Sequence, residues 1–162
     1  MATLERSDSI SVSGLLPAEV IAAEMDVKNR NEVFEGLVDL LAEAGKVEDP
    51  DEALKAVKDR EDILSTGIGN GVAIPHAKTD AVDGLVAAFG RVEQGVDFKS
   101  LDGKPARLIF LLLSPQGEAG LHVRALARIS RMLKNTQFRS RLLEAGSVEE
   151  IIEIIQKQEE QQ

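Results

Sequence analysis

His76 is the residue of this chain best suited to chemistry near neutral pH, because an imidazole side chain exchanges its proton in that range. It ends the run Ser65–His76, in which Gly67, Gly69 and Gly71 stand at every second position. Glycines allow positive φ angles, and a turn built on them can offer backbone N–H groups to an anion. A lone histidine is more often structural or simply exposed, but this glycine-rich setting favours a functional role. The pattern therefore predicts a reactive histidine beside an anion-binding loop.

Two other side chains could assist His76. His122 falls in the first turn of a helix predicted over Ala119–Lys134, on the apolar face of that helix. The position is typical of a core histidine, but the positive end of the helix dipole also favours a neutral ring that could orient or hydrogen-bond a neighbour. Arg60 falls in the last turn of the helix before the glycine loop, where the dipole favours a cation. It either serves that helix end alone or supplies a positive charge to the loop.

Nucleotide and metal chemistry fit the sequence less well. No Gly-Lys-Ser/Thr follows the glycines, and their spacing is not that of the dinucleotide fingerprint. A zinc site made of His76, His122 and an acid such as Asp80 or Asp83 is possible on ligand count. The spacing matches no metalloprotease or deaminase motif, so a metallo-hydrolase is the weakest of the hypotheses considered.

The composition excludes several other classes of protein. The 162 residues carry a net charge of −9, and only 3% of them are aromatic, which argues against binding of nucleic acid. The absence of cysteine excludes disulfides, thiolate catalysis and cysteine-based zinc sites. No apolar run approaches the roughly 20 residues of a membrane-spanning helix, and the start does not have the pattern of a signal peptide. We expect one soluble, cytoplasmic domain with no direct insertion into a membrane.

Helices and strands alternate along the chain. Asn29 and Asp49 are predicted helix N-caps, the first with Glu32 three residues later and the second followed by Pro50. The interleaved order predicts an α/β fold with helices on both faces of a sheet. Residues 1–14 are expected to be a flexible N-terminus and 158–162 a frayed tail. Helices are predicted over 29–44, 50–62, 119–134, 136–145 and 151–156, and strands over 20–25, 72–74, 85–92 and 107–113.

A stripe of positive charge is predicted on the helix over residues 119–134. Arg124, Arg128 and Arg131 share one face of that helix in an otherwise acidic chain. The simpler interpretation is a solvated face, and the alternative is a docking surface for an acidic partner.

Taken in order, Arg60-Glu61, the run Ser65–His76, the strand Arg107–Pro115 and His122 resemble one family. The chain is similar to the type 2 EIIA domains of the bacterial phosphoenolpyruvate-dependent phosphotransferase system, the mannitol/fructose class that includes the nitrogen-regulatory EIIA. The resemblance covers about residues 15–157, and its Thr-Gly-x-Gly-x-Gly-x-Ala-x-Pro-His block is highly specific.

This resemblance implies a single α/β domain with a mixed sheet, and it implies that His76 accepts a phosphoryl group from the phosphocarrier protein HPr on Nε2. Arg60 and His122 align with the two residues that surround that histidine in the family. Arg60 would then supply charge to the phosphoryl group, and His122 would hydrogen-bond one of its oxygens. The cradle would be completed by Thr66 and by the backbone N–H groups of Gly67, Gly69 and Gly71.

The resemblance also implies the partners. The phosphoryl group would pass to an EIIB subunit for sugar uptake, or the protein would signal by its phosphorylation state to regulated target proteins. No metal and no other cofactor is implied, because the donor is a phosphohistidine rather than a nucleotide polyphosphate.

Overall fold

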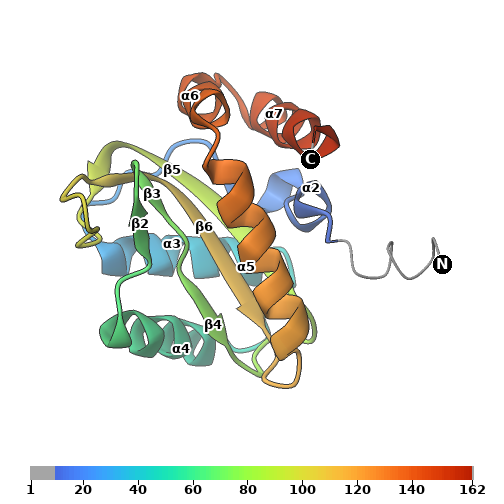
Figure 1. Cartoon of the computed structure of the whole chain (residues 1–162). Coiled ribbons are helices and arrows are strands. Elements are labelled where there is room, and N and C mark those ends of the chain that lie inside the picture. The colour runs from blue at the N-terminus through green and yellow to red at the C-terminus, as the bar shows by residue number, and fades with distance from the viewer. Residues whose placement is uncertain (1–9, 162) are drawn as a thin grey trace.

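A mixed six-stranded sheet forms the centre of the computed structural model, which describes residues 10–161 (Figure 1). Its strands are β1 (Ile21–Ala22), β2 (Gly67–Gly69), β3 (Val72–Ala73), β4 (His76–Lys78), β5 (Val86–Val96) and β6 (Ala106–Ser114). Across the sheet the order is β1–β5–β6–β3–β2, and β4 also pairs with β6. The β5–β6 and β2–β3 pairs are antiparallel, whereas the β1–β5, β3–β6 and β4–β6 pairs are parallel.

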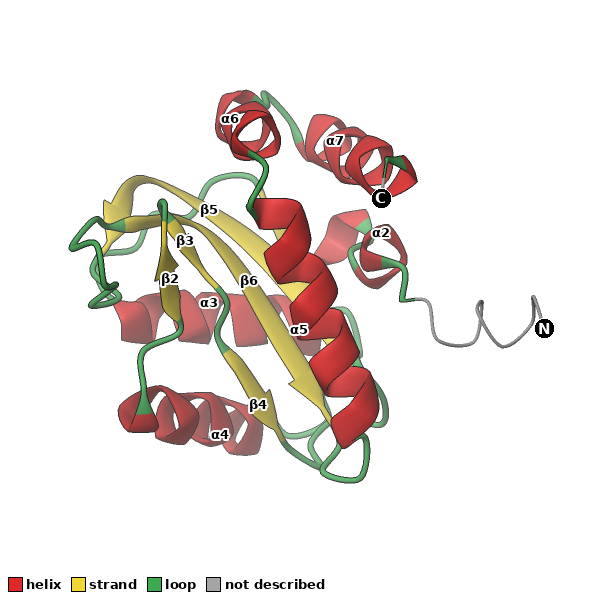
Figure 2. Ribbon diagram, in the orientation of Figure 1, coloured by secondary structure: helices red, strands yellow, loops and turns green. Residues whose placement is uncertain are grey.

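Helices cover both faces of this sheet. Figure 2 shows α5 lying across the front of the strands and α3 behind them. The α/β class, the mixed sheet and its coverage on both faces agree with the sequence analysis. The helices are α2 (Val12–Leu15), α3 (Arg30–Glu43), α4 (Pro50–Ile63), α5 (Ala119–Leu133), α6 (Thr136–Glu144) and α7 (Val148–Glu160), with a 3₁₀ turn, η1 (Ala18–Val20), before β1.

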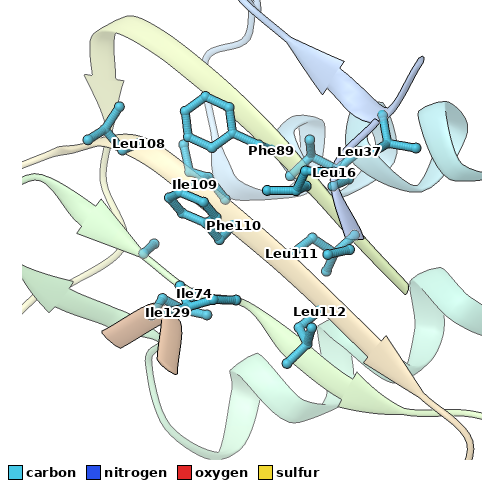
Figure 3. Packing of buried hydrophobic residues seen from close by; sticks show 14 of the residues in the cluster. Leu16, Leu37, Ile74, Phe89, Leu108, Ile109, Phe110, Leu111, Leu112 and Ile129 are labelled. Atoms are coloured by element: carbon cyan, nitrogen blue, oxygen red, sulfur yellow. The ribbon is translucent and has the colours of Figure 1, made fainter. Parts of the chain in front are cut away.

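The core is built around β6. Every residue from Leu108 to Leu113 is buried, as expected for a central strand covered on both sides. Phe110 packs against Phe89 of β5 with 4.7 Å between the ring centroids. Figure 3 shows these rings together with Leu37 from α3 and Ile129 from α5. Alternate β6 side chains point to opposite faces of the sheet, so this one strand anchors helices on both sides.

The predicted helix starts are confirmed by their hydrogen bonds. The Asn29 side chain accepts from the Glu32 N–H at 2.9 Å, and the Asp49 side chain accepts from the Glu52 N–H at 3.1 Å. Each bond satisfies one of the N–H groups that lack a partner in the first turn of a helix. Local signals therefore fix the start of both helices. The predicted strand over 20–25 is shorter in the structure, because only Ile21 and Ala22 pair with β5.

The two chain ends differ from the expectation. α2 begins within the segment expected to be flexible, and its Val12 is buried. α7 extends to Glu160, beyond the predicted end at residue 156, and Gln158 is buried. The Glu159 carboxylate accepts from the Val12 N–H at 2.6 Å and the Ser13 N–H at 2.9 Å, so each end holds the other. Residues 1–9 and 162 lie outside the described part of the chain.

None of the helices within residues 10–161 is long and apolar enough to span a membrane.

Candidate functional site

A cleft of about 640 Å³ lies between α4, β4 and α5, at the end of β6. His76 and Lys78 line it from β4, where alternate residues point to the same side. Arg60 comes from the last turn of α4 and His122 from the first turn of α5. The structure thus brings together His76, His122 and Arg60, the three residues that the sequence analysis placed at the reaction centre.

His76 is placed by a break between β3 and β4. Both short strands run parallel to β6, β3 beside its first half and β4 beside its second, and Pro75 lies in the gap between them. The Pro75 carbonyl still accepts from the Leu112 N–H at 3.0 Å, so the break stays attached to β6. His76 is therefore the first residue of a strand rather than part of a free loop, and its backbone position is fixed by the central strand.

The tautomer of His76 follows from one hydrogen bond. Nδ1 lies 2.8 Å from the carbonyl oxygen of Ile74. A carbonyl can only accept, so Nδ1 carries the proton and Nε2 has a free electron pair. Burial lowers the pKa of His76, with a further lowering by Arg60, while the Ile74 carbonyl and Glu61 act in the opposite direction. The half-buried ring is thus neutral at pH 7, with a nucleophilic Nε2.

His122 lies opposite His76, with 5.4 Å between the ring centroids and 59° between the ring planes. Its side chain is buried, as its place on the apolar face of α5 predicted. Its pKa is lowered to about 4, mainly by burial, with smaller contributions from the neighbouring His76 ring and from the charges of Lys78 and Arg60. The ring is therefore neutral in the physiological range.

Positive charge surrounds the mouth of the cleft. Arg60 donates one Nη1–H to the carbonyl of Leu64 at 2.9 Å, which ties its guanidinium to the end of α4. The Lys78 side chain is exposed at the edge of the cleft. Guanidinium and ammonium groups are the side chains that bind phosphoryl oxygens in proteins. Asp59 is the acid that lines the same cleft.

Apolar side chains are exposed beside these charges. Ile63 at the end of α4 is 80% exposed, and Val123 in the first turn of α5 is 60% exposed. Both line the cleft. Leu64 and Ile68, which follow in the chain, are 67% and 51% exposed. Large apolar residues that cluster on a surface indicate contact with another macromolecule.

The glycines of the predicted cradle lie elsewhere. Gly69 and Gly71 have φ angles of 88° and 78° and form the turn of the β2–β3 hairpin, and none of the three glycines lines the cleft. Gly67 packs closely against the segment after β5, because a Cβ there would come within 2.9 Å of the Phe98 Cβ. A hairpin turn and close packing are the structural roles that these glycines have here, and their expected role in binding a phosphoryl group stays a prediction.

Thr66 also serves the structure. Its hydroxyl donates to Glu61 Oε1 at 2.7 Å and its N–H donates to Glu61 Oε2 at 2.9 Å, and both residues are buried. Arg30 contacts the same carboxylate at 3.4 Å. The hydroxyl donates to Glu61 and Thr66 does not line the cleft, so its expected contact with a phosphoryl group stays a prediction.

The expected arginine stripe is only partly free. Arg128 donates to Glu159 at 3.2 Å and so belongs to the contact between the chain ends. Arg124 and Arg131 are exposed, in agreement with the solvated face. Within residues 10–161, no group of three or more histidine, cysteine, aspartate or glutamate side chains is arranged to hold a metal ion.

The sequence analysis gave no role to three residues that lie at or beside the site, which are Ser114, Glu61 and Lys78. Ser114, the last residue of β6, lies 2.6 Å from Nδ1 of His122 through its Oγ. Glu61 fixes the segment after α4. Lys78 could have been found from its spacing, because residues i and i+2 of a strand share a face. Ser114 could have been noticed because it is a single hydroxyl residue at the end of the apolar run Leu108–Leu113.

Comparison with known proteins agrees with this geometry. Residues 14–158 match the family described as phosphoenolpyruvate-dependent sugar phosphotransferase system, EIIA 2. The chain is 39% identical over 148 residues to the fructose-specific EIIA component of Haloferax volcanii, covering 91% of this chain and 96% of that protein. It is 41% identical over 146 residues to the fructose-specific EIIABC component of Bacillus subtilis, covering 90% of this chain but only 23% of that longer protein.

A solved structure shares the whole architecture. The crystal structure of the nitrogen regulatory protein IIA-Ntr from Neisseria meningitidis superposes with a TM-score of 0.83 at 33% identity, covering 89% of this chain and 98% of that chain. The family match spans most of the sequence, and the Haloferax volcanii and Neisseria meningitidis proteins are each covered over nearly their whole length. The chain therefore belongs to the type 2 EIIA family of the phosphoenolpyruvate-dependent sugar phosphotransferase system.

Proposed function

We propose that this protein is a cytoplasmic phosphocarrier whose His76 accepts a phosphoryl group on Nε2 from phosphorylated HPr and passes it to an EIIB subunit. The observation that carries the proposal is the hydrogen bond from His76 Nδ1 to the Ile74 carbonyl, which leaves Nε2 as the nucleophile. Membership of a family of phosphotransferase components supports it.

The proposed transfer conserves bonds and electrons, and no proton has to move between groups of the site. The Nε2 electron pair of His76 forms a bond to phosphorus while the bond between phosphorus and the donor nitrogen breaks, and that electron pair returns to the donor ring. Nδ1 of His76 keeps its proton throughout and donates it in a hydrogen bond to the Ile74 carbonyl, which stabilises the phosphorylated ring. Arg60 and Lys78 offset the charge spread over the equatorial oxygens, which is the main requirement for phosphoryl transfer.

The exposed apolar residues support a protein, rather than a small molecule, as donor and acceptor. Ile63 and Val123 lie on the rim of the cleft, where a partner would cover them on docking. A docked partner would also exclude water from the transferring group, which strengthens the electrostatic interactions with it.

The test is the intact mass of the full chain after incubation with phosphoenolpyruvate, enzyme I and HPr. Wild type is expected to gain one acid-labile phosphoryl group, and His76→Ala none. His122→Ala is the matched control, because it removes an imidazole from the same cleft but leaves the proposed acceptor. No gain in wild type with a working cascade, or an equal gain in His76→Ala, would overturn the proposal.

A second candidate is a regulatory module that binds target proteins according to its phosphorylation state. The observation that favours it is the superposition over nearly all of a nitrogen regulatory protein. The two candidates differ in what happens after phosphorylation. Incubation of the phosphorylated protein with an EIIB subunit separates them, since loss of the phosphoryl group to EIIB is expected only of the transport component.

A further inference from the structure

Ser114 and His122 form a buried pair behind the cleft. Ser114 Oγ lies 2.6 Å from His122 Nδ1, and the two residues are 0% and 4% exposed. Ser114 is held in place by β6, and its carbonyl accepts from the Thr79 N–H at 2.8 Å. The contact therefore joins the end of the central strand to the first turn of α5, and it occupies the ring nitrogen that faces the core.

The direction of this hydrogen bond follows from the needs of the buried hydroxyl. Within residues 10–161, His122 is the one hydrogen-bond partner of Ser114 Oγ. If Nδ1 donated, the hydroxyl proton would be buried without an acceptor, and the cost of removing it from water would not be offset. If the hydroxyl donates, its proton and the Nδ1 electron pair are both satisfied. The second arrangement therefore has the lower free energy.

We propose that Ser114 is a positioning residue that donates its hydroxyl proton to Nδ1 of His122 and so holds His122 as the tautomer with a proton on Nε2. The remaining nitrogen, Nε2, is then a hydrogen-bond donor toward the cleft and His76. The use of this donor to bind a phosphoryl oxygen rests on the proposed function, but the assignment of the tautomer does not.

Because His122 is neutral, its tautomer decides whether Nε2 can donate a hydrogen bond into the cleft. With a pKa of about 4 the ring is neutral at pH 7, so it has one proton to place on one of two nitrogens. His76 has an unprotonated Nε2 at the same cleft. If Nε2 of His122 were also unprotonated, the cleft would contain two imidazole electron pairs and no imidazole N–H donor. The charged residues that line the cleft with His122 are Lys78, Arg60 and Asp59, and none of them is hydrogen-bonded to Nδ1. Ser114 is therefore the group that selects between the tautomers.

The tautomer is measured by ¹⁵N NMR of the unphosphorylated full chain labelled at histidine. Wild type is expected to show a pyrrole-type shift at Nε2 of His122 and a pyridine-type shift at Nδ1. In Ser114→Ala the two forms are expected to mix, so that both shifts become averaged, whereas Ser114→Thr keeps the hydroxyl and the wild-type pattern. Ser100→Ala is the control, because Ser100 is another buried serine hydroxyl but has no hydrogen-bond partner in the described residues. A pyridine-type Nε2 in wild type would overturn the proposal.

A kinetic test shows whether Ser114 acts through His122. Ser114→Ala is expected to slow phosphoryl acceptance by about 10-fold, less than the loss of a whole donor. In a His122→Ala background the same change is expected to have no further effect, because its target is gone. Equal slowing in both backgrounds would mean that Ser114 supports the fold only. Failure of the proposed function would look different, since wild type would then show the expected tautomer but no phosphorylation.

Discussion

His76 and His122 face each other across 5.4 Å, centroid to centroid, and each ring has its Nδ1 engaged by a group on the protein side. The Ile74 carbonyl fixes the proton of His76 on Nδ1, and the Ser114 hydroxyl satisfies Nδ1 of His122. Each ring therefore turns its Nε2 toward the cleft. On our two proposals one nitrogen is the nucleophile and the other a hydrogen-bond donor, so two identical side chains have opposite roles because their Nδ1 partners differ.

The pKa of His76 is expected to lie below 6.5 and to rise when Arg60 is replaced by alanine. Burial lowers this pKa most, and Arg60 adds a positive charge that disfavours the imidazolium. An NMR titration of the His76 ring in wild type and Arg60→Ala measures both midpoints. Arg131→Ala, which removes an exposed arginine elsewhere on the surface, serves as the control. A midpoint that does not move in Arg60→Ala would show that Arg60 does not act on this ring.

Stability is expected to fall on acidification because of His122. Its pKa is about 4 in the folded protein and near 6.5 in the unfolded chain, so between these values the unfolded chain binds the proton first. The stabilisation is complete above pH 6.5 and is lost progressively as the pH falls toward 4, by about 3 kcal/mol in total. Urea unfolding at several pH values measures it.

His122→Gln is the comparison for that experiment, because glutamine does not titrate. The chain has only two histidines, and the pKa of His76 is lowered in the same direction, so part of the acid dependence is expected to remain in the variant. Wild type and His122→Gln should therefore diverge between pH 6.5 and 4. Parallel curves over that window would contradict the lowered pKa of His122.

Replacement of Arg60 is expected to slow phosphoryl acceptance without preventing it. Arg60→Ala removes a positioned charge beside the transferring group, which costs on the order of 100-fold or more in rate. Arg60→Lys keeps the charge but not the planar fork of donors, and an intermediate rate is expected. Quenched time courses of the phosphorylated mass supply these rates. If Arg60→Ala reacted as fast as wild type, Arg60 would have no part in the transfer.

Glu61 is expected to be essential for the shape of the segment that follows α4. Its carboxylate accepts both the N–H and the hydroxyl of Thr66, so Glu61→Ala leaves two buried donors unpaired at about 1–3 kcal/mol each. Glu61→Gln keeps one acceptor oxygen and should lose less. Asp62→Asn is the matched control, since Asp62 is exposed and next in the chain. Urea unfolding compares the three variants, and equal stability of Glu61→Ala and Asp62→Asn would exclude this role.

Much of the fold could be predicted because its signals are local. Asn29, Asp49 and Asn135 each accept from an N–H three residues later, a pattern visible in the sequence. The grouping of His76, His122 and Arg60 in one cleft agrees with the motif in which His76 stands, and the reactive role of His76 stays a prediction. The extended α7 was not, since Glu159 is held by backbone N–H groups at the other end of the chain. The sequence of a polar C-terminal segment predicts fraying when the groups that hold it lie at the other end of the chain.

The glycine loop shows a second limit of sequence reasoning. Alternating glycines indicate that the backbone adopts positive φ angles or packs closely against another group. They do not indicate which group that is. In this fold Gly69 and Gly71 turn a hairpin whose tip lies beside Lys104 and Arg107, away from His76. The pairing of β3 and β4 with different halves of β6 decides this separation. Strand register is a long-range property, so periodicity alone could not supply it.

Arg91 is expected to contribute more to stability than any surface arginine. It is 9% exposed in β5, where Nε donates to the Ala23 carbonyl at 2.9 Å and Nη1 donates to the carbonyls of Leu142 and Ala145 at 2.7 Å each. Two of these carbonyls end α6, where helix geometry leaves them without partners and the dipole favours a cation. Arg91→Met keeps much of the volume but leaves buried acceptors unpaired, and a loss of about 3 kcal/mol is expected in urea unfolding. Arg124→Met, at an exposed position, should change stability by less than about 0.5 kcal/mol. A loss for Arg91→Met as small as that of the control would show that the carbonyls find other partners and that α6 does not depend on β5 for its end.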